Sequence, residues 1–153
     1  MRALEHKIPP PIITLLTAAA MWGIARLSPV IETGGPIRLA VAAALAAVGL
    51  LFAAPAVLAF RRARTTINPV DINAASALVT GGIFGVTRNP MYAGMLFVLL
   101  GWMVFLAAPW GLFGPVGFML FITRIQIMPE ERVMAGKFGT QYAEYRQRTR
   151  RWL

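Results

Sequence analysis

The chain has 153 residues, of which 58% are hydrophobic and 14% are charged; since a soluble domain carries charge at about a quarter of its positions, the composition indicates a single polytopic membrane domain over residues 1–153. The formal net charge of +9 is then typical of cytoplasmic loops and of contacts with anionic lipid, and it does not indicate nucleic-acid binding. The chain has no cysteine and one histidine, His6, which excludes disulfides, thiol nucleophiles, histidine-based metal sites and histidine-based catalytic triads.

Two apolar runs in the first half of the chain predict two membrane helices. The first run, residues 9–25, is short for a span of about 20 residues, and Arg26 at its end is long enough to reach the headgroups. A signal peptide is the alternative, but the prolines that open the run and the lack of a small-residue cleavage site favour a helix. The second run, residues 37–60, is long enough to cross with some tilt and is rich in alanine, which permits close helix packing in lipid.

Two further runs, residues 91–108 and 112–128, are separated by a short turn without charge and predict a helical hairpin. Arg124 lies inside the last run, where a charge is costly unless it has a partner. Its side chain either extends to the membrane surface or reaches into a polar pocket, and the sequence leaves both open. The predicted fold class is therefore all-α, a bundle of four transmembrane helices.

An amphipathic helix is predicted from Pro129 to the basic end of the chain. Its apolar residues fall at spacings of four, four and three, which forms one stripe suited to the membrane surface. These residues are Met134, Phe138, Tyr142 and Tyr145. The arginines and Trp152 that follow are typical of an interfacial anchor.

The distribution of lysine and arginine predicts the orientation. Twelve of these residues lie in the N-terminal tail, the loop after the second run and the tail after the fourth run, against two in the loop between the first and second runs. By the positive-inside rule, both termini and the middle loop face the cytoplasm. The polar residues before the third helix and after the fourth are therefore expected to meet on one cytoplasmic face.

The stretch from Leu78 to Gly94, LVTGGIFGVTRNPMYAG, stands out as a candidate binding motif. Asn89 is a favourable N-cap and Pro90 suits the first helical position, so a helix is predicted to begin here with its positive end exposed. The glycines before it would let the backbone approach a ligand closely. An ordinary turn that enters a helix is the alternative explanation of these residues.

The second half of the candidate site is the sequence Pro129-Glu130-Glu131-Arg132, directly after the fourth run. Two carboxylates in a first helical turn are favourable for the helix dipole alone. However, the two carboxylates lie at the end of a predicted membrane span, where a charge is costly unless it has a partner. This position favours a polar pocket as the explanation.

These two motifs, in this order and followed by KFGTQYAEYRQRTRRWL, resemble membrane methyltransferases related to isoprenylcysteine carboxyl methyltransferase and phospholipid methyltransferases. That family pattern runs Leu-Val-Thr-x-Gly, Arg-His-Pro-x-Tyr-x-Gly, a helical hairpin, Glu-Glu, and Phe-Gly-x-x-Tyr-x-x-Tyr. The resemblance covers residues 76–153, and the first two helices match only as generic spans.

The resemblance implies S-adenosylmethionine as the cofactor. By position in the shared motifs, the cofactor-binding residues would be Leu78, Val79, Phe84, Arg88, Asn89, Pro90, Tyr92 and Glu130. The chemistry is compatible, because a helix N-terminus suits the cofactor carboxylate, a glutamate suits its ammonium, and an aromatic ring attracts a sulfonium.

Two departures from the family pattern affect the acceptor. Asn89 replaces the usual histidine, so a histidine-specific role is lost while hydrogen bonding is kept. The arginine that prenylcysteine enzymes place four residues before the first glutamate is Gln126 here, and Arg124 lies on roughly the opposite helix face. Arg124 and Gln126 remain the candidate substrate-binding residues, and a prenylcysteine carboxylate is disfavoured as acceptor.

The sequence thus predicts an S-adenosylmethionine-dependent membrane methyltransferase that acts on a small or lipid-like acceptor reached from the bilayer. The catalytic residue is not identified, and the candidates are Glu131, Tyr92 and Arg124. Membrane lipids are the expected partners, with no metal, no nucleic acid and no obligate protein partner. The alternative is a non-catalytic membrane adaptor that binds anionic lipid or a partner through its basic tail.

Overall fold

The computed structural model describes residues 8–27, 29, 34–64 and 76–153, and within these residues the secondary structure is helical apart from one isolated bridge between Thr87 and Arg150. The N-terminal tail with His6 and the middle of the polar loop, residues 65–75, lie outside the described residues. The long helices are α1 (Pro10–Arg26), α2 (Gly35–Arg62), α3 (Pro90–Leu106), α4 (Phe113–Ile122) and α5 (Met128–Arg148). Three short helical segments connect them, namely η3 (Gly82–Gly85), η4 (Pro109–Leu112) and η5 (Thr123–Ile127).

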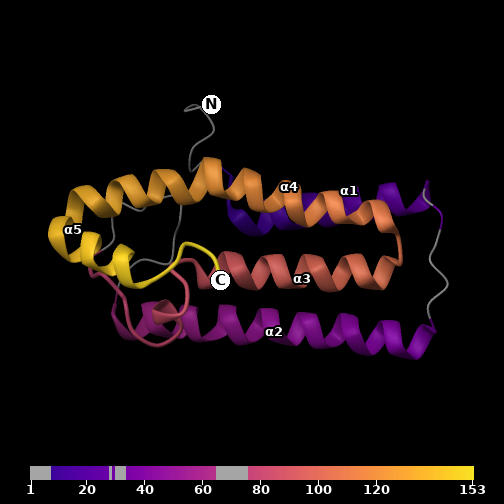
Figure 1. Ribbon diagram of the computed structural model, residues 1–153, viewed down its shortest axis with the longest axis horizontal. Helices are drawn as coiled ribbons and strands as arrows, with labels where there is room; N and C mark the ends of the chain where they lie inside the picture. Colours follow the sequence, from indigo (N-terminus) through magenta and orange to yellow (C-terminus); the bar gives the residue numbers. More distant parts are fainter. Residues whose placement is uncertain (1–7, 28, 30–33, 65–75) are drawn as a thin grey trace.

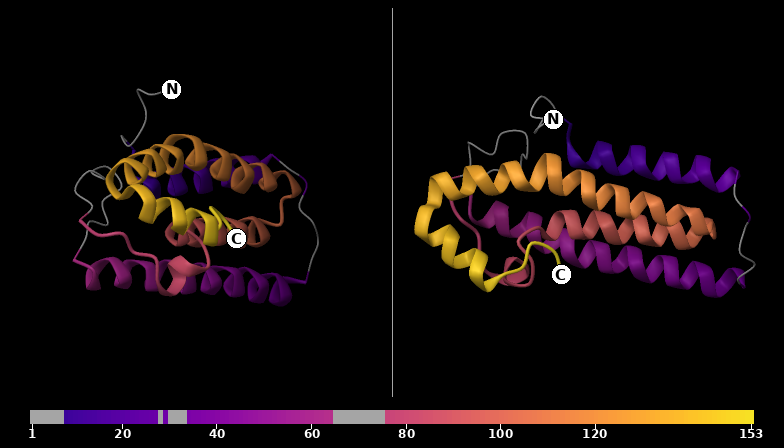
Figure 2. Two further views of the ribbon diagram at one scale, coloured as in Figure 1. Left: turned by 60° about the vertical axis from the view of Figure 1, so that its left-hand side comes forward. Right: turned by 45° about the horizontal axis from the view of Figure 1, so that its top comes forward.

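The four apolar runs are all helices, as predicted, and α1 to α4 lie lengthwise beside one another (Figures 1 and 2). α5 continues from α4 at one end of this bundle and then turns back, so that the C-terminal end of the chain lies near the start of α3 (Figure 1). Residues 78–94 and 129–132, the two motifs described above, therefore come together at this end of the bundle. We call this end the pocket end.

Glycine residues, which have no side chain, explain why α2 packs so closely on α3. A Cβ atom on Gly49 would lie 2.6 Å from the carbonyl oxygen of Gly94, and one on Gly101 would lie 2.8 Å from the carbonyl oxygen of Ala42. Contacts this short are possible only between backbones without intervening side chains. The small residues of the second run thus form a packing surface and are there for more than their helix propensity.

Two helical stretches are long and apolar enough to cross a membrane, judged by length and composition. They are α2, with 28 residues, and the continuous helix Pro109–Arg148, with 40. α3 is apolar but has 17 residues, and α1 has 17 as well, which gives a length of about 25 Å at 1.5 Å per residue. The structure therefore supports two spans by this test, and four spans remain a prediction.

The tail departs from the predicted separate amphipathic helix in two ways. α5 is joined to α4 without a break through the π-helical turn η5, and π-turns of this kind are frequent at functional sites. Within α5, Gly139 has φ 46° and ψ −119°, a backbone conformation that strongly favours glycine. This residue reverses the chain direction and sends the rest of α5 back over the pocket end (Figure 1).

The prediction that the apolar stripe of the tail lies on the membrane surface is wrong for its second half. Tyr142 and Tyr145 are buried in a cluster with Phe84 and Ala56, and Met134 and Phe138 pack against that cluster. The reversal at Gly139 explains the difference, because it turns the stripe toward α2 and η3. The stripe therefore forms part of the protein core.

Candidate functional site

A pocket at the pocket end brings both sequence motifs together. Its cavity volume is about 90 Å³, and the cavity opens to solvent through a mouth. Small-molecule sites commonly offer about 300–1,000 Å³, so a ligand of nucleoside size would extend into the mouth. The lining residues are Phe60, Leu78, Val79, Phe84, Arg88, Asn89, Glu130, Glu131, Met134, Tyr142 and Tyr145.

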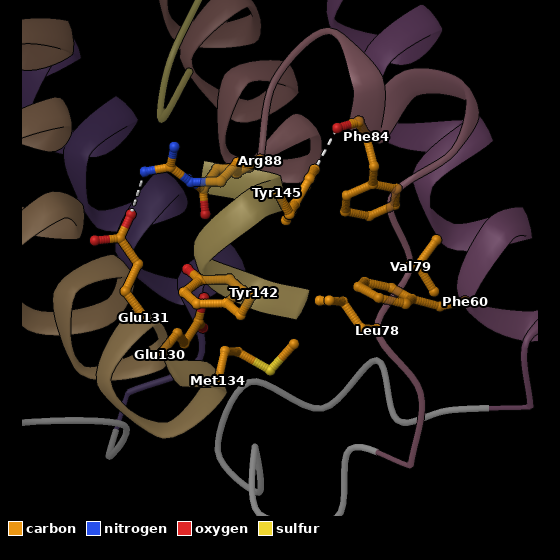
Figure 3. Close-up of a pocket in the computed structure, with 11 residues that line it drawn as sticks. Phe60, Leu78, Val79, Phe84, Arg88, Glu130, Glu131, Met134, Tyr142 and Tyr145 are labelled. Atoms are coloured by element: carbon orange, nitrogen blue, oxygen red, sulfur yellow. Dashed lines mark hydrogen bonds and ion pairs between the residues drawn. The ribbon is translucent and has the colours of Figure 1, made fainter. Parts of the chain in front are cut away.

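The pocket has a charged side and an apolar side (Figure 3). Arg88, Glu130 and Glu131 lie on the first, while Phe60, Leu78, Val79 and Phe84 form the second. The rings of Phe60 and Phe84 lie 5.0 Å apart in a tilted arrangement, which is a favourable geometry for aromatic pairs. The result is a site with an apolar, partly aromatic wall that faces ionisable groups.

Tyr145 ties the returning part of α5 to the glycine-rich segment. Its hydroxyl donates a hydrogen bond of 2.7 Å to the carbonyl oxygen of Phe84, and both residues are buried. Because this carbonyl lies at the 3₁₀ turn η3, the bond satisfies a backbone group that the short turn leaves without a helical partner. The position of Phe84 in the pocket wall thus depends on a residue 61 positions later.

Glu130 is surrounded by neutral hydrogen-bond donors. The hydroxyl of Tyr92 donates to its Oε1 at 2.5 Å, and the Nε2 of Gln126 donates to the same oxygen at 3.2 Å. Tyr92 and Gln126 are buried, Tyr92 in the first turns of α3 and Gln126 in η5. Among the described residues, no arginine or lysine forms an ion pair with Glu130. Of the two adjacent glutamates, Glu130 is therefore the one without a cationic partner among these residues.

Glu131, the adjacent carboxylate, is paired with two arginines. Arg88 donates from Nη2 to Oε1 at 2.8 Å, while Arg151 donates from Nε to Oε1 at 3.0 Å and from Nη2 to Oε2 at 2.6 Å. The hydrogen bond to Glu131 also raises the pKa of Arg151, which therefore stays charged. Such charge-assisted and bidentate pairs are the strong kind. Glu131 is thus held by two cationic groups, whereas the partners of Glu130 are neutral.

Asn89 precedes α3 as expected, but its side chain does not cap the helix. Its Nδ2 donates instead to the carbonyl oxygen of Arg151 at 2.9 Å, and its backbone N–H donates to Oγ1 of Thr87 at 3.2 Å. The capping prediction is wrong because a backbone segment from the far end of the sequence competes for the amide. Pro90 is buried at the first position of α3, as expected.

The structure brings together most of the residues singled out in the sequence. Six of the predicted cofactor residues and Glu131 line the pocket. Tyr92 and Gln126 do not line it but donate hydrogen bonds to Glu130, which does. Pro90 is the first residue of α3, beside the pocket. Arg124 does not line the pocket. Its side chain is exposed and its Nη1 contacts the sulfur of Met128 at 3.8 Å.

Phe60 and Arg151 are site residues that the sequence did not reveal. Phe60 is the last residue before the arginines that end α2. In the sequence it is the end of an apolar run, and nothing there predicts that it lines a pocket. Arg151 is one of several arginines near the end of the chain, and no local pattern separates it from its exposed neighbours. For Tyr142 and Tyr145, the helical spacing predicts a stripe on the membrane surface, whereas the structure places both in the pocket lining.

Comparison with known proteins agrees with the motifs at the pocket end. A 63-residue uncharacterized protein of Haemophilus influenzae is 40% identical over its whole length, which corresponds to 41% of this chain. No solved structure matches the chain. The phospholipid methyltransferase family matches residues 37–141, a region that begins in α2 and ends before Tyr142. Since that region is more than half of the protein, the chain belongs to the phospholipid methyltransferase family, whose membership implies a membrane methyltransferase.

Proposed function

We propose that the protein is an S-adenosylmethionine-dependent methyltransferase whose acceptor is a small or lipid-like molecule reached from the bilayer. The observation that carries this proposal is the pocket itself, in which a carboxylate with only neutral partners faces an apolar aromatic wall. Family membership supplies the reaction class. The choice of cofactor rests on how well its groups fit the residues that line the pocket.

The charged side of the pocket suits the amino-acid part of this cofactor. Glu130 has no cationic partner among the described residues and would accept hydrogen bonds from an ammonium group. The start of α3 beside Asn89 offers N–H groups and a positive dipole end for a carboxylate. The ammonium and the carboxylate of the cofactor's amino-acid part would thus each meet a group of opposite charge on this side of the pocket.

The apolar side suits an adenine ring and a sulfonium. Phe60, Leu78 and Val79 form a surface on which a flat base would pack, while the rings of Phe84 and Tyr142 would attract a positive sulfur. Because the cavity volume is about 90 Å³, part of the ligand would occupy the mouth.

The bound cofactor would supply a methyl group on sulfur, which a nucleophile displaces directly. The residues of this chain would contribute alignment and charge placement, the factors that such displacements need most. Glu131 is occupied by two guanidinium groups, and Tyr92 reaches the pocket only through Glu130. Neither is therefore assigned as a dedicated base, and Arg124 does not line the pocket.

We further propose that the pocket and both termini face the cytoplasm, and that α1 and α3 cross the membrane together with the two longer stretches. The charge distribution along the sequence supports this orientation. Many large apolar side chains on α1, α2 and α4 are exposed, as lipid-facing residues are. An acceptor would then approach from the bilayer, since lipid surrounds the bundle below the pocket.

Equilibrium titration of the purified protein with S-adenosylhomocysteine tests the proposal without knowledge of the acceptor. Wild type should bind, and Glu130→Gln should bind about 10- to 100-fold more weakly, as expected for the loss of a hydrogen bond to a charged group. Glu144→Gln is the matched control, because Glu144 is an exposed glutamate on α5 that does not line the pocket. Absence of binding by wild type would refute the proposed cofactor.

A further inference from the structure

Residues 149–153, which we call the strap, run beside the segment that precedes α3. The backbone N–H of Arg88 donates to the carbonyl oxygen of Arg150 at 2.9 Å. The carbonyl oxygen of Arg151 accepts from Oγ1 of Thr87 at 3.1 Å and from Nδ2 of Asn89 at 2.9 Å. One edge of the strap is thus bonded along three consecutive residues of the pocket motif.

The other edge of the strap is bonded to the long helix made of α4, η5 and α5. Nε1 of Trp152 donates to Oγ1 of Thr123 at 3.2 Å, and the indole packs against the apolar cluster that contains Tyr92 and Ile127. The strap therefore contacts both halves of the site, namely the segment before α3 and the long helix of α4, η5 and α5, which lie far apart in the sequence.

Arg151 makes this junction ionic. It binds Glu131 through two nitrogens, and Glu131 in turn binds Arg88. The other terminal nitrogen of Arg88 donates to the carbonyl oxygens of Thr149 and Arg146. Arg88 and Glu131 line the pocket whereas Arg151 does not, so Arg151 influences the pocket wall through other residues.

The charge balance of the site depends on this arrangement. Glu130 and Glu131 are neighbours in one helical turn and both line the pocket. Without Arg151, Glu131 would keep a single cationic partner, Arg88, and would be freer to turn toward the pocket or to compete for a ligand cation. With Arg151 in place, Glu131 is paired with two arginines, while Glu130 has neutral partners.

We propose that Arg151 is a positioning residue of the cofactor site, which neutralises Glu131 and fixes Arg88 so that Glu130 alone meets the cationic end of the ligand. This inference rests on the proposed function. It assigns a role in binding to a residue outside the region that matches the family, residues 37–141. Arg151 does not touch the ligand in this assignment and is not a catalytic residue.

Ligand affinity is the first measurement. Arg151→Gln should weaken the binding of S-adenosylhomocysteine by about fivefold or more, in the range of typical coupling between neighbouring groups. Arg151→Lys should recover part of the loss, because lysine keeps the charge but lacks the planar fork of arginine. Arg148→Gln is the matched control, since Arg148 is an exposed arginine of the same tail outside the strap.

The second measurement reports on the strap without any ligand. The chain lacks cysteine, so Thr149→Cys provides a single thiol at a position that is only 6% exposed. This thiol should react slowly with a soluble maleimide in the otherwise unchanged protein and faster when Arg151→Gln is added. Saturating S-adenosylhomocysteine should slow the reaction further in the protein that retains Arg151.

The outcomes separate this inference from the proposed function. If wild type does not bind S-adenosylhomocysteine, the proposed cofactor and the assigned role of Arg151 both fall. If wild type binds and the folded Arg151→Gln variant binds equally well, the role of Arg151 falls while the proposed function stands. Should Arg151→Gln not fold, Arg151→Ala takes its place, because it removes the same charge, and wild-type affinity in that variant would also overturn the assignment.

Discussion

The α2–α3 interface and the pocket end are held together by different forces. Between α2 and α3, glycines bring two backbones into direct contact, as at Gly49 and Gly94. At the pocket end, charged and polar side chains join segments that lie more than 40 residues apart, as Arg88 joins Glu131. The first interface depends on volume and the second on charge, so each should fail under a different kind of substitution.

This contrast also fits the setting that we propose for the two regions, with the helices in lipid and the pocket end at the membrane surface. In lipid, apolar side chains gain little by leaving their surroundings, so helices associate through close packing. Near the membrane surface, ion pairs and hydrogen bonds are available to a segment such as the strap, but salt screens them where they are exposed. The bundle is thus expected to be rigid, and the strap is expected to be the part that responds to ionic conditions.

The largest effect is expected from a side chain inserted between α2 and α3. Gly94→Leu would place a Cβ 2.6 Å from the carbonyl oxygen of Gly49 and force the helices apart. We expect a loss of about 3 kcal/mol or more in the free energy of unfolding, measured by thermal unfolding in detergent. Gly117→Leu is the control, because a Cβ at Gly117 meets no atom within 4 Å. Equal stability of the two variants would contradict this account of the interface.

The two glutamates should respond in opposite ways. Glu130→Gln should lower the affinity for S-adenosylhomocysteine, by about 1.5–3 kcal/mol, and change stability little, since its present partners Tyr92 and Gln126 are neutral. Glu131→Gln should mainly lower stability, because it leaves Arg88 and Arg151 close together without their shared carboxylate. Parallel ligand titration and thermal unfolding of both variants measure the two effects. A loss of stability confined to Glu130→Gln would reverse the assignment.

Asn89 gives a sharper test of the strap. An aspartate suits a helix N-cap as well as asparagine does, so Asn89→Asp would be harmless if Asn89 were a cap. Because Nδ2 of Asn89 donates to the carbonyl oxygen of Arg151, the aspartate would instead set two acceptors against each other. We expect a loss of about 1–3 kcal/mol in the free energy of unfolding, larger than that of Asn89→Ala. Wild-type stability of Asn89→Asp would restore the capping interpretation.

The helices and most of the pocket residues can be predicted from the sequence, but the way in which the pocket is closed cannot. The apolar runs and the glycine-proline punctuation predict α2, α3 and the hairpin, because these depend on residues close in sequence. The stripe that contains Tyr142 has a helical period whichever surface covers it, so its burial could not be foreseen. The pairing of Asn89 with Arg151 spans 62 positions and has no local signal.

Gly139 shows how one residue decides such an outcome. In the sequence it resembles any glycine in an amphipathic helix, where it costs some stability and nothing more. In the structure its positive φ reverses the chain, and this reversal brings Tyr145 and the strap to the pocket. A pattern with a period of 3.6 residues cannot reveal a reversal that one pair of dihedral angles produces.

The smallest effect is expected at the hydroxyl of Tyr145, which isolates one contact of the returning helix. Tyr145→Phe keeps the ring within the cluster of Phe84 and Ala56 and removes only the donor to the carbonyl oxygen of Phe84. Because that carbonyl is then buried without this partner, we expect a loss of about 1–2 kcal/mol in the free energy of unfolding. Tyr142→Phe is the matched control: its ring belongs to the same cluster, and its hydroxyl makes no comparable bond among the described contacts, so stability should hold. If the two variants unfold alike, the hydroxyl of Tyr145 does not fix the glycine-rich turn, and ring packing alone holds the returning part of α5 against the pocket.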